Sequence, residues 1–185
     1  MAEVAARACS VLALALVLAG CGVLAAQAPG ALSVRHAALE RGGGAALLAL
    51  ELDCRLSGPM QDALDHGIPL TLVVDLRAGS GLRTRARAQP RIELRWFPLS
   101  RRYQLRELGS DDVRSFATRA TLLAALGALR IGLPPEFAGV APGTPLEVSV
   151  ALDPGALPGA LRLPALFEPA WQLSSPGTQW LAGAP

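Results

Sequence analysis

The sequence predicts an α+β domain: a mainly antiparallel sheet of about six or seven strands, forming a sandwich or half-barrel, packs against two helices. Three observations support this fold class. Several runs alternate apolar and polar residues with a period of two, which is typical of half-buried strands. Two segments begin with a capping serine and continue with inward apolar residues. Ten of the fifteen prolines lie between Pro134 and Pro185, where we expect mostly loop or edge strand.

The composition fits one domain with an aliphatic core. The chain has 185 residues, of which 51% are hydrophobic but only 4% aromatic. A chain of this length can bury a core of its own. Cys9 and Cys21 belong to an apolar leader, so Cys54 is the single cysteine of the domain. It cannot form an internal disulfide, and packing alone must stabilise the fold.

The domain is expected to begin with two strands. Residues 32–40 form the first, and a glycine-rich turn follows. In residues 48–56, leucines alternate with charged side chains, which predicts a strand with one buried face. This alternation places Cys54 on the core face, where a thiol is usually inert.

A short helix and a third strand come next. Ser57 is placed as the helix N-cap, Pro59 is tolerated in the first turn, and Gly67 can end the helix. Residues 68–77 alternate again and form the strand. A flexible basic loop then follows, with three arginines at every second position: Arg83, Arg85 and Arg87.

Residues 91–107 predict a β-hairpin with one apolar and one basic face. The turn lies at Pro98, because proline cannot donate a hydrogen bond to a strand ladder. Five side chains are assigned to the core face: Ile92, Leu94, Trp96, Tyr103 and Leu105. The opposite face carries the candidate partner-binding residues Arg91, Arg95, Arg102 and Arg106.

The remaining elements are one helix and two strands. Ser110 is placed as an N-cap, and apolar residues recur at helical spacing from Val113 until the helix ends near Gly127. Residues 146–152 alternate strictly and form a strand. Residues 169–173 offer a last short strand.

The N-terminus predicts export. Ala8 to Gly20 is apolar throughout, which is the length of a signal-peptide core. It ends in Leu18-Ala19-Gly20-Cys21, which resembles the lipobox of bacterial lipoproteins, in which the cysteine thiol receives a diacylglycerol. Cys21 is therefore the candidate lipidation site. Ordinary cleavage near Ala26 and an uncleaved anchor from Ala8 to Ala26 are the alternatives.

Each alternative places the domain outside the cytoplasm. We expect an outer-membrane lipoprotein, with a soluble periplasmic or an N-terminally anchored protein as the other outcomes. The expected organisation is a leader at 1–20, a linker at 21–31, a domain at 32–175 and a tail at 176–185.

The charge is unevenly distributed. All 17 basic residues are arginine, and nine of them fall in residues 77–106 with a single acid, Glu93, which is a net +8. The rest of the chain carries eight arginines and fourteen acids, a net −6. Nucleic acid is excluded as a partner by the export prediction. An envelope protein or an anionic lipid surface fits the basic segment better.

Catalytic and metal-binding signals are weak. Asp62 and His66 are four residues apart and could share a helix face, but no third ligand is placed to complete a metal site. The segment Gly79-Ser80-Gly81 lacks the frame of a nucleophile elbow, and no phosphate-binding glycine motif occurs. We therefore expect no enzyme and no cofactor.

The order of several short motifs resembles a known family. These motifs are Leu64-Asp65-His66-Gly67-Ile68-Pro69-Leu70, Leu99-Ser100-Arg101-Arg102-Tyr103, the segment 116–126, Leu152-Asp153-x-x-x-Leu157-Pro158 and Trp171-x-Leu173-Ser174-Ser175. Between Leu32 and Trp180 the chain is similar to an exported proteobacterial family, the domain-of-unknown-function family 4390, also labelled proline-rich signal peptide protein. The family has no assigned activity, so the resemblance implies no site residue.

The function expected from the sequence is non-catalytic. The leading prediction is a module of the cell envelope that faces the periplasm and binds a partner through the basic hairpin. The alternative is a carrier that encloses a small apolar ligand or lipid within its sheet. A hydrolytic enzyme comes third.

Overall fold

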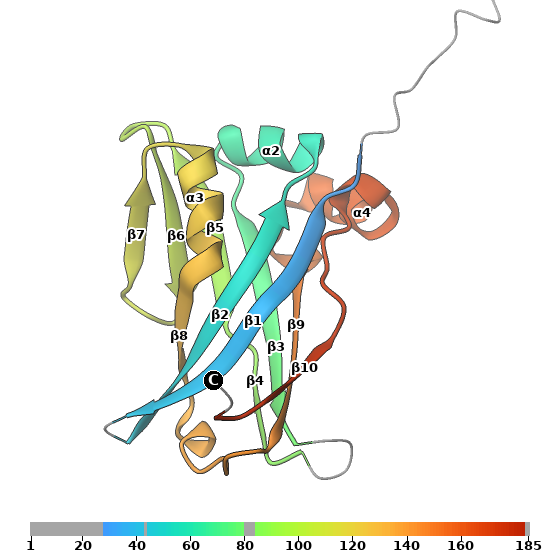
Figure 1. Cartoon of the computed structure of the whole chain (residues 1–185). Coiled ribbons are helices and arrows are strands. Elements are labelled where there is room, and N and C mark those ends of the chain that lie inside the picture. The colour runs from blue at the N-terminus through green and yellow to red at the C-terminus, as the bar shows by residue number, and fades with distance from the viewer. Residues whose placement is uncertain (1–27, 43, 80–83, 184–185) are drawn as a thin grey trace, which may run out of the picture.

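Two antiparallel sheets pack face to face in the computed structural model, which describes residues 28–42, 44–79 and 84–183. The smaller sheet has the strand order β1-β2-β8. The larger, seven-stranded sheet has the order β10-β9-β3-β5-β6-β7, with β4 paired to β3. Figure 1 shows β1 and β2 crossing in front of the larger sheet. The α+β fold class and its mainly antiparallel pairing are confirmed.

The smaller sheet is built on one long hairpin. β1 (Ala31–Gly42) pairs with β2 (Ala45–Arg55), and the register shifts between Val34 and His36. β8 (Leu129–Leu133) then adds to the other edge of β2. The predicted alternation holds in β2, because Leu48, Leu50 and Leu52 point into the core.

The larger sheet contains seven strands within the described residues. They are β3 (Leu70–Ala78), β4 (Ala86–Ala88), β5 (Arg91–Phe97), β6 (Arg102–Leu108), β7 (Val113–Phe116), β9 (Pro145–Leu152) and β10 (Thr178–Leu181). β3 lies at the centre, because it pairs with β4, β5 and β9. Its Leu70, Leu72, Val74 and Leu76 are completely buried.

α2 (Gly58–Asp65) begins and ends as predicted. The Ser57 hydroxyl accepts a hydrogen bond from the Met60 N–H at 3.4 Å, and proline occupies the first turn. Gly67 has a φ of 84°, a conformation that glycine adopts without a steric penalty. α2 therefore crosses the upper end of the sheets with Met60, Ala63 and Leu64 buried beneath it.

α3 (Arg119–Ala125) lies beside β2 over the larger sheet (Figure 1). Its N-cap is Thr118, which forms a reciprocal capping box with Thr121. Ser110 therefore is not the cap that we predicted: its hydroxyl accepts from the Asp112 N–H at 3.0 Å in a turn. Residues 113–116 form β7 instead of the first helical turn, because they pair with β6.

A third helix, α4 (Gly159–Phe167), lies in the proline-rich segment and was not predicted. The expected strand at 169–173 is also wrong, because residues 169–171 form a 3-10 helix there. The four 3-10 helices of the described chain are η2 (Leu126–Ala128), η3 (Pro135–Phe137), η4 (Pro154–Ala156) and η5 (Pro169–Trp171).

The two sheets meet along both sides of the core. On one side, β10 contacts β1, and the His36 and Trp180 rings pack edge to face with centroids 5.3 Å apart. On the other side, the Glu107 carboxylate of β6 accepts a hydrogen bond from the Gly132 backbone of β8. β10 lies in the segment that we expected to be a tail, so the folded domain extends through it.

Candidate interaction surface

The four candidate arginines lie on one face of the larger sheet. Residues that pair across antiparallel strands share a face. In the β5–β6 register, Arg95 pairs with Gln104 and Arg106 pairs with Glu93, while Arg91 and Arg102 pair with Leu108 and Phe97. Arg91, Arg95, Arg102 and Arg106 therefore form one outward surface, which we call the basic face.

The opposite face of the same hairpin is buried, which fixes the direction of the arginines. Ile92, Leu94 and Leu105 have exposed fractions of 1%, 0% and 5%. Because side chains alternate along a strand, burying these three forces their neighbours to the outside. A slip of one residue would turn these arginines and Glu93 toward the core, so the register of the basic face is strongly specified.

Two arginines of the basic face have acidic partners. Arg106 Nη2 lies 3.1 Å from Glu93 Oε1 on the neighbouring strand. Arg91 Nη1 lies 3.7 Å from Asp153 Oδ2, which follows β9. Both pairs are half exposed, so they stabilise the fold little, but they neutralise this part of the face.

The other two, Arg95 and Arg102, have no acidic partner within the part of the chain that the structure describes. Both side chains are exposed. The Arg95 guanidinium instead stacks over the Phe97 ring at 4.9 Å from its centroid, a cation–π contact. Phe97 pairs across the strands with Arg102, so the ring lies between two unneutralised cations.

The positive charge therefore gathers at the turn end of the hairpin. Arg101 lies in this turn, and Leu99 at its tip is fully exposed. Farther along the sheet, Asp75 pairs with Arg77 at 2.9 Å and with Arg87 at 3.1 Å. Burial by itself would raise the pKa of Asp75, but the two arginines together hold it below its ordinary value. Acidic side chains from outside residues 77–106 thus neutralise much of the charge of the predicted basic segment.

Phe97 is the member of this surface that sequence reasoning missed. The signal was available, because Phe97 continues the alternation of Arg91, Glu93 and Arg95 and must share their face. The arginines that we expected in a flexible basic loop differ in their positions. Arg87 belongs to β4, while Arg83 lies outside the described residues.

Cys54 has the chemistry of a structural thiol. It packs against the core from β2 and forms no disulfide. Burial, followed by the charge of Asp53, raises the pKa of the thiol from 9.0 to about 12. Because the thiolate is the nucleophile, Cys54 is protonated and unreactive at neutral pH.

His66 and Asp62 do not form the side-chain pair that we considered. The His66 ring nitrogen Nδ1 lies 2.6 Å from the backbone oxygen of Asp62, so the imidazole closes the end of α2. Across the described ranges, no group of three or more His, Cys, Asp or Glu side chains could hold a metal ion.

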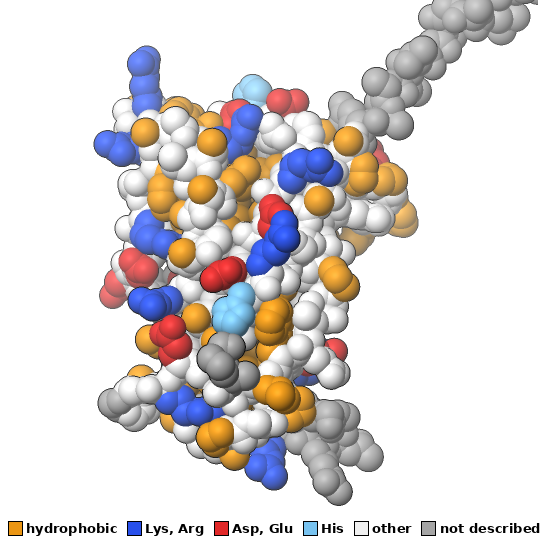
Figure 2. Space-filling view, in the orientation of Figure 1, with side chains coloured by type: hydrophobic (Ala, Val, Ile, Leu, Met, Phe, Trp, Pro, Cys, Tyr) orange, Lys and Arg blue, Asp and Glu red, His pale blue; other side chains and the backbone are white. Residues whose placement is uncertain are grey.

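A groove of about 490 Å³ lies on the outer face of the smaller sheet. Ala38 and Ala49 line it together with the charged or polar side chains of His36, Glu51 and Arg130. Figure 2 looks onto this side of the molecule, where charges of both signs alternate. A carrier of an apolar ligand needs an enclosed apolar cavity instead, so this groove does not favour the carrier alternative.

The leader and Cys21 lie outside the described residues, so the structure says nothing of lipidation. Among the helices that it does describe, none has the length and apolarity needed to cross a membrane.

The fold and the surface define an α+β protein with mainly antiparallel sheets and an arginine-bearing outer face. The family model with the description "Domain of unknown function (DUF4390)" matches residues 30–181, and the chain belongs to this family. The match begins within the expected linker and ends with β10. Neither the curated proteins nor the solved structures contain a match to the chain.

Proposed function

We propose that this protein is an exported, non-catalytic interaction module of the cell envelope that binds an acidic surface of another envelope protein through its basic face. The observation that carries the proposal is the pairing of β5 with β6, which aligns four arginines outward and leaves Arg95 and Arg102 without acidic partners among the described residues.

The chemistry of this end of the hairpin favours a protein partner. A guanidinium is always charged and binds carboxylates in a bidentate manner, and its planar group also stacks on aromatic rings. Phe97 holds Arg95 against the sheet, which reduces the side-chain freedom lost on binding. Arginine and aromatic residues are both enriched at the centres of protein interfaces.

The test places a photo-crosslinking residue at Ser115. This residue of β7 is exposed and pairs with Gln104, so it shares the basic face without belonging to the charge cluster. In living cells, we expect it to capture a defined protein. The double variant Arg95→Gln/Arg102→Gln should reduce this capture at least several-fold. When the crosslinking is repeated on isolated membranes, added salt should also reduce the capture.

The matched control is the double variant Arg35→Gln/Arg130→Gln. Both arginines are exposed but belong to the smaller sheet, so capture from Ser115 should be unchanged. Equal loss in both double variants, or no capture at all, would overturn the proposal. A lipid adduct that depends on Arg95 and Arg102 would replace the protein partner with the anionic lipid surface.

A further inference from the structure

α4 presents an apolar surface to solvent. Leu163, Leu166 and Phe167 have exposed fractions of 67%, 55% and 76%. Their spacing places them on one side of the helix, because residues three and four apart are neighbours there. The other side of α4 is held to the domain by the buried Ala165 and the half-buried Leu161. We call Leu163, Leu166 and Phe167 the α4 patch.

The α4 patch belongs to the end of the domain from which the N-terminal segment leaves. Gly30 lies so close to Leu173 that an added Cβ would come within 2.9 Å of its side chain. Ser57, beside the start of α2, donates a hydrogen bond to the Ala170 oxygen of η5 at 2.5 Å, and η5 contacts α4. Figure 1 shows α2, α4 and the start of β1 at this one end.

The segment that connects Cys21 to the described domain is short. Only residues 22–27 separate Cys21 from Ala28, and the apolar run from Ala8 to Gly20 immediately precedes Cys21. Seven residue steps span at most about 25 Å when fully extended. If the chain is held in a bilayer at Cys21 or by its apolar run, this end of the domain stays beside that bilayer.

We propose that the α4 patch docks on the bilayer in which the N-terminus is anchored, and so holds the domain in one orientation on the membrane. This inference rests on the export in the proposed function and on the N-terminal membrane attachment expected from the sequence, but not on the basic face. A diacylglycerol or an apolar helix attaches the chain stably but leaves the domain free to rotate about its linker, whereas burying three apolar side chains in the interfacial region fixes its orientation.

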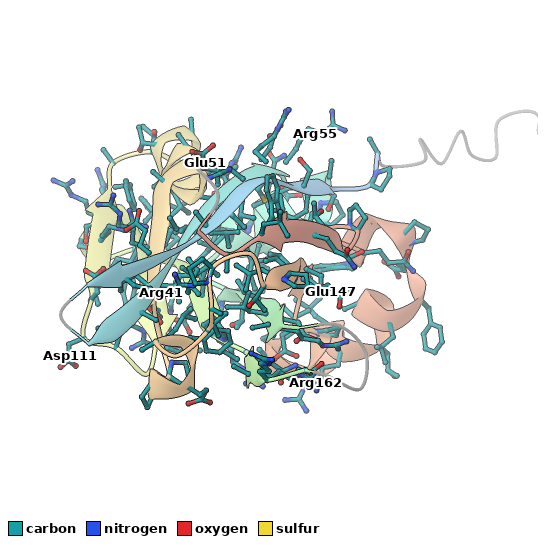
Figure 3. All side chains as sticks on the ribbon, turned by 60° about the horizontal axis from the view of Figure 1, so that its bottom comes forward. Arg41, Glu51, Arg55, Asp111, Glu147 and Arg162 are labelled. Atoms are coloured by element: carbon teal, nitrogen blue, oxygen red, sulfur yellow. The ribbon has the colours of Figure 1, made fainter. Side chains whose placement is uncertain are left out.

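Two arginines at this end suit contact with lipid phosphates, while the exposed Glu168 directly follows the α4 patch. Arg55 and Arg162 are both exposed, and Figure 3 shows their guanidinium groups at the surface on two sides of the molecule. The Arg162 Nε donates to the Leu157 oxygen at 2.9 Å, which orients this arginine beside the α4 patch. Arginines that flank an apolar surface can contact phosphates while that surface enters the acyl boundary.

The experiment uses the full chain, purified from membranes and reconstituted into vesicles of phosphatidylethanolamine and phosphatidylglycerol. A photo-crosslinking residue replaces Leu166 in one variant and Leu181 in the other. The two leucines are matched, because each is 55% exposed, but Leu181 lies on β10 away from α4. We expect several-fold more lipid adduct from position 166 than from position 181.

Three results would overturn the proposal: equal lipid adduct at both positions, adducts from position 166 to residues 1–27, or adducts from position 166 to a second copy. One further measurement distinguishes the α4 patch proposal from the proposed function of the basic face. The Arg95→Gln/Arg102→Gln variant should give the same lipid adduct from position 166, whereas it should lose the protein captured from Ser115. The α4 patch and the basic face can therefore fail independently.

Discussion

At the scale of residues, Asp65 connects three elements near the turn end of the hairpin. Its carboxylate accepts a hydrogen bond from the Tyr103 hydroxyl at 2.7 Å and also pairs with Arg119. The three residues come from α2, β6 and α3. Tyr103 also packs against Trp96, with ring centroids 4.5 Å apart. This cluster fixes two helices to the inner side of the hairpin whose outer side is the basic face.

The cluster makes the stability of the protein sensitive to alkaline pH. Burial, the hydrogen bond to Asp65 and the charge of Asp65 raise the pKa of Tyr103 above 10.0, although Arg119 opposes them. A raised pKa means that the folded state favours the protonated phenol. The contribution to stability is therefore complete below about pH 10 and is lost as the pH rises through the folded-state pKa.

We predict that Asp65→Asn lowers the pKa of Tyr103 toward its ordinary value, because the variant removes the negative charge that opposes ionisation. Tyr103 is the only tyrosine of the chain, so the phenolate absorbance of the folded protein reports this residue alone. Asp62→Asn is the matched control, since Asp62 is exposed on the same helix. An unchanged titration in Asp65→Asn would contradict the assignment.

At the scale of elements, the boundary between β7 and α3 shows how tertiary pairing overrides a local pattern. Val113, Phe116, Ala120 and Leu123 recur at intervals of three and four, which favours one continuous helix. In the structure, β6 pairs with residues 113–116 and draws them into the sheet. The helix can begin only after this pairing ends, at Thr118.

We predict that Thr118→Ala lowers the free energy of unfolding by about 1 kcal/mol, because it removes the capping box of α3. Ser110→Ala should cost about 0.5 kcal/mol or less, since Ser110 closes only a turn. Urea unfolding of the two variants measures the difference. If Ser110→Ala lowers the free energy of unfolding more than Thr118→Ala does, the helix begins at Ser110 and not at Thr118.

The elements that the sequence predicts well are those with strong local signals. Strict alternation identifies β2, β3, β5, β6 and β9, and Ser57 with Gly67 frames α2. α4 was missed because Pro164 lies inside it and Pro158 precedes it. The short strands β8 and β10 have little pattern of their own and depend on partners distant in sequence.

The candidate site was predicted in the same uneven way. Alternation alone indicates that the four arginines share a face, because the buried side of the hairpin is unmistakably apolar. It cannot indicate which of them are neutralised. Asp153, the partner of Arg91, follows β9, which β3 separates from β5, so only the folded sheet distinguishes Arg91 from Arg95 and Arg102.

At the scale of the whole molecule, the two sheets form one sandwich with a shared aliphatic core. Phe137, Leu48 and Leu72, from η3, β2 and β3, are all completely buried within it. The core is closed on one side by β1 and β10, where His36 meets Trp180. The Trp180 side chain thus contributes to both sheets, although its indole nitrogen finds no hydrogen-bond partner among the described residues.

We predict that Trp180→Ala destabilises the whole domain by about 2 kcal/mol, because it removes a half-buried ring from this junction. Trp180→Phe should cost much less, since it keeps an aromatic ring and removes the unpaired N–H. Thermal unfolding, followed by fluorescence and circular dichroism, measures both variants. Equal losses of stability in the two variants would show that ring packing is not the main contribution of Trp180 to the stability of the domain.

Leu181→Ala is the control for position. Leu181 is the neighbour of Trp180 on β10 but points outward, with 55% of its side chain exposed. Its removal should change the free energy of unfolding by about 0.5 kcal/mol or less. A loss as large as that of Trp180→Ala would mean that any change in β10 destabilises the domain.

The junction of β1 with β10 also determines when the domain can complete its fold. These strands are the first and the last of the described chain, so the ring of Trp180 is made long after that of His36. Until β10 has been made, the larger sheet lacks its last strand and the edge of β9 is unpaired, although all three strands of the smaller sheet are already present. Contacts this distant in sequence form slowly, and exposed strand edges invite association in the interval. We therefore expect the edge of β9 to be open to association until β10 pairs with it.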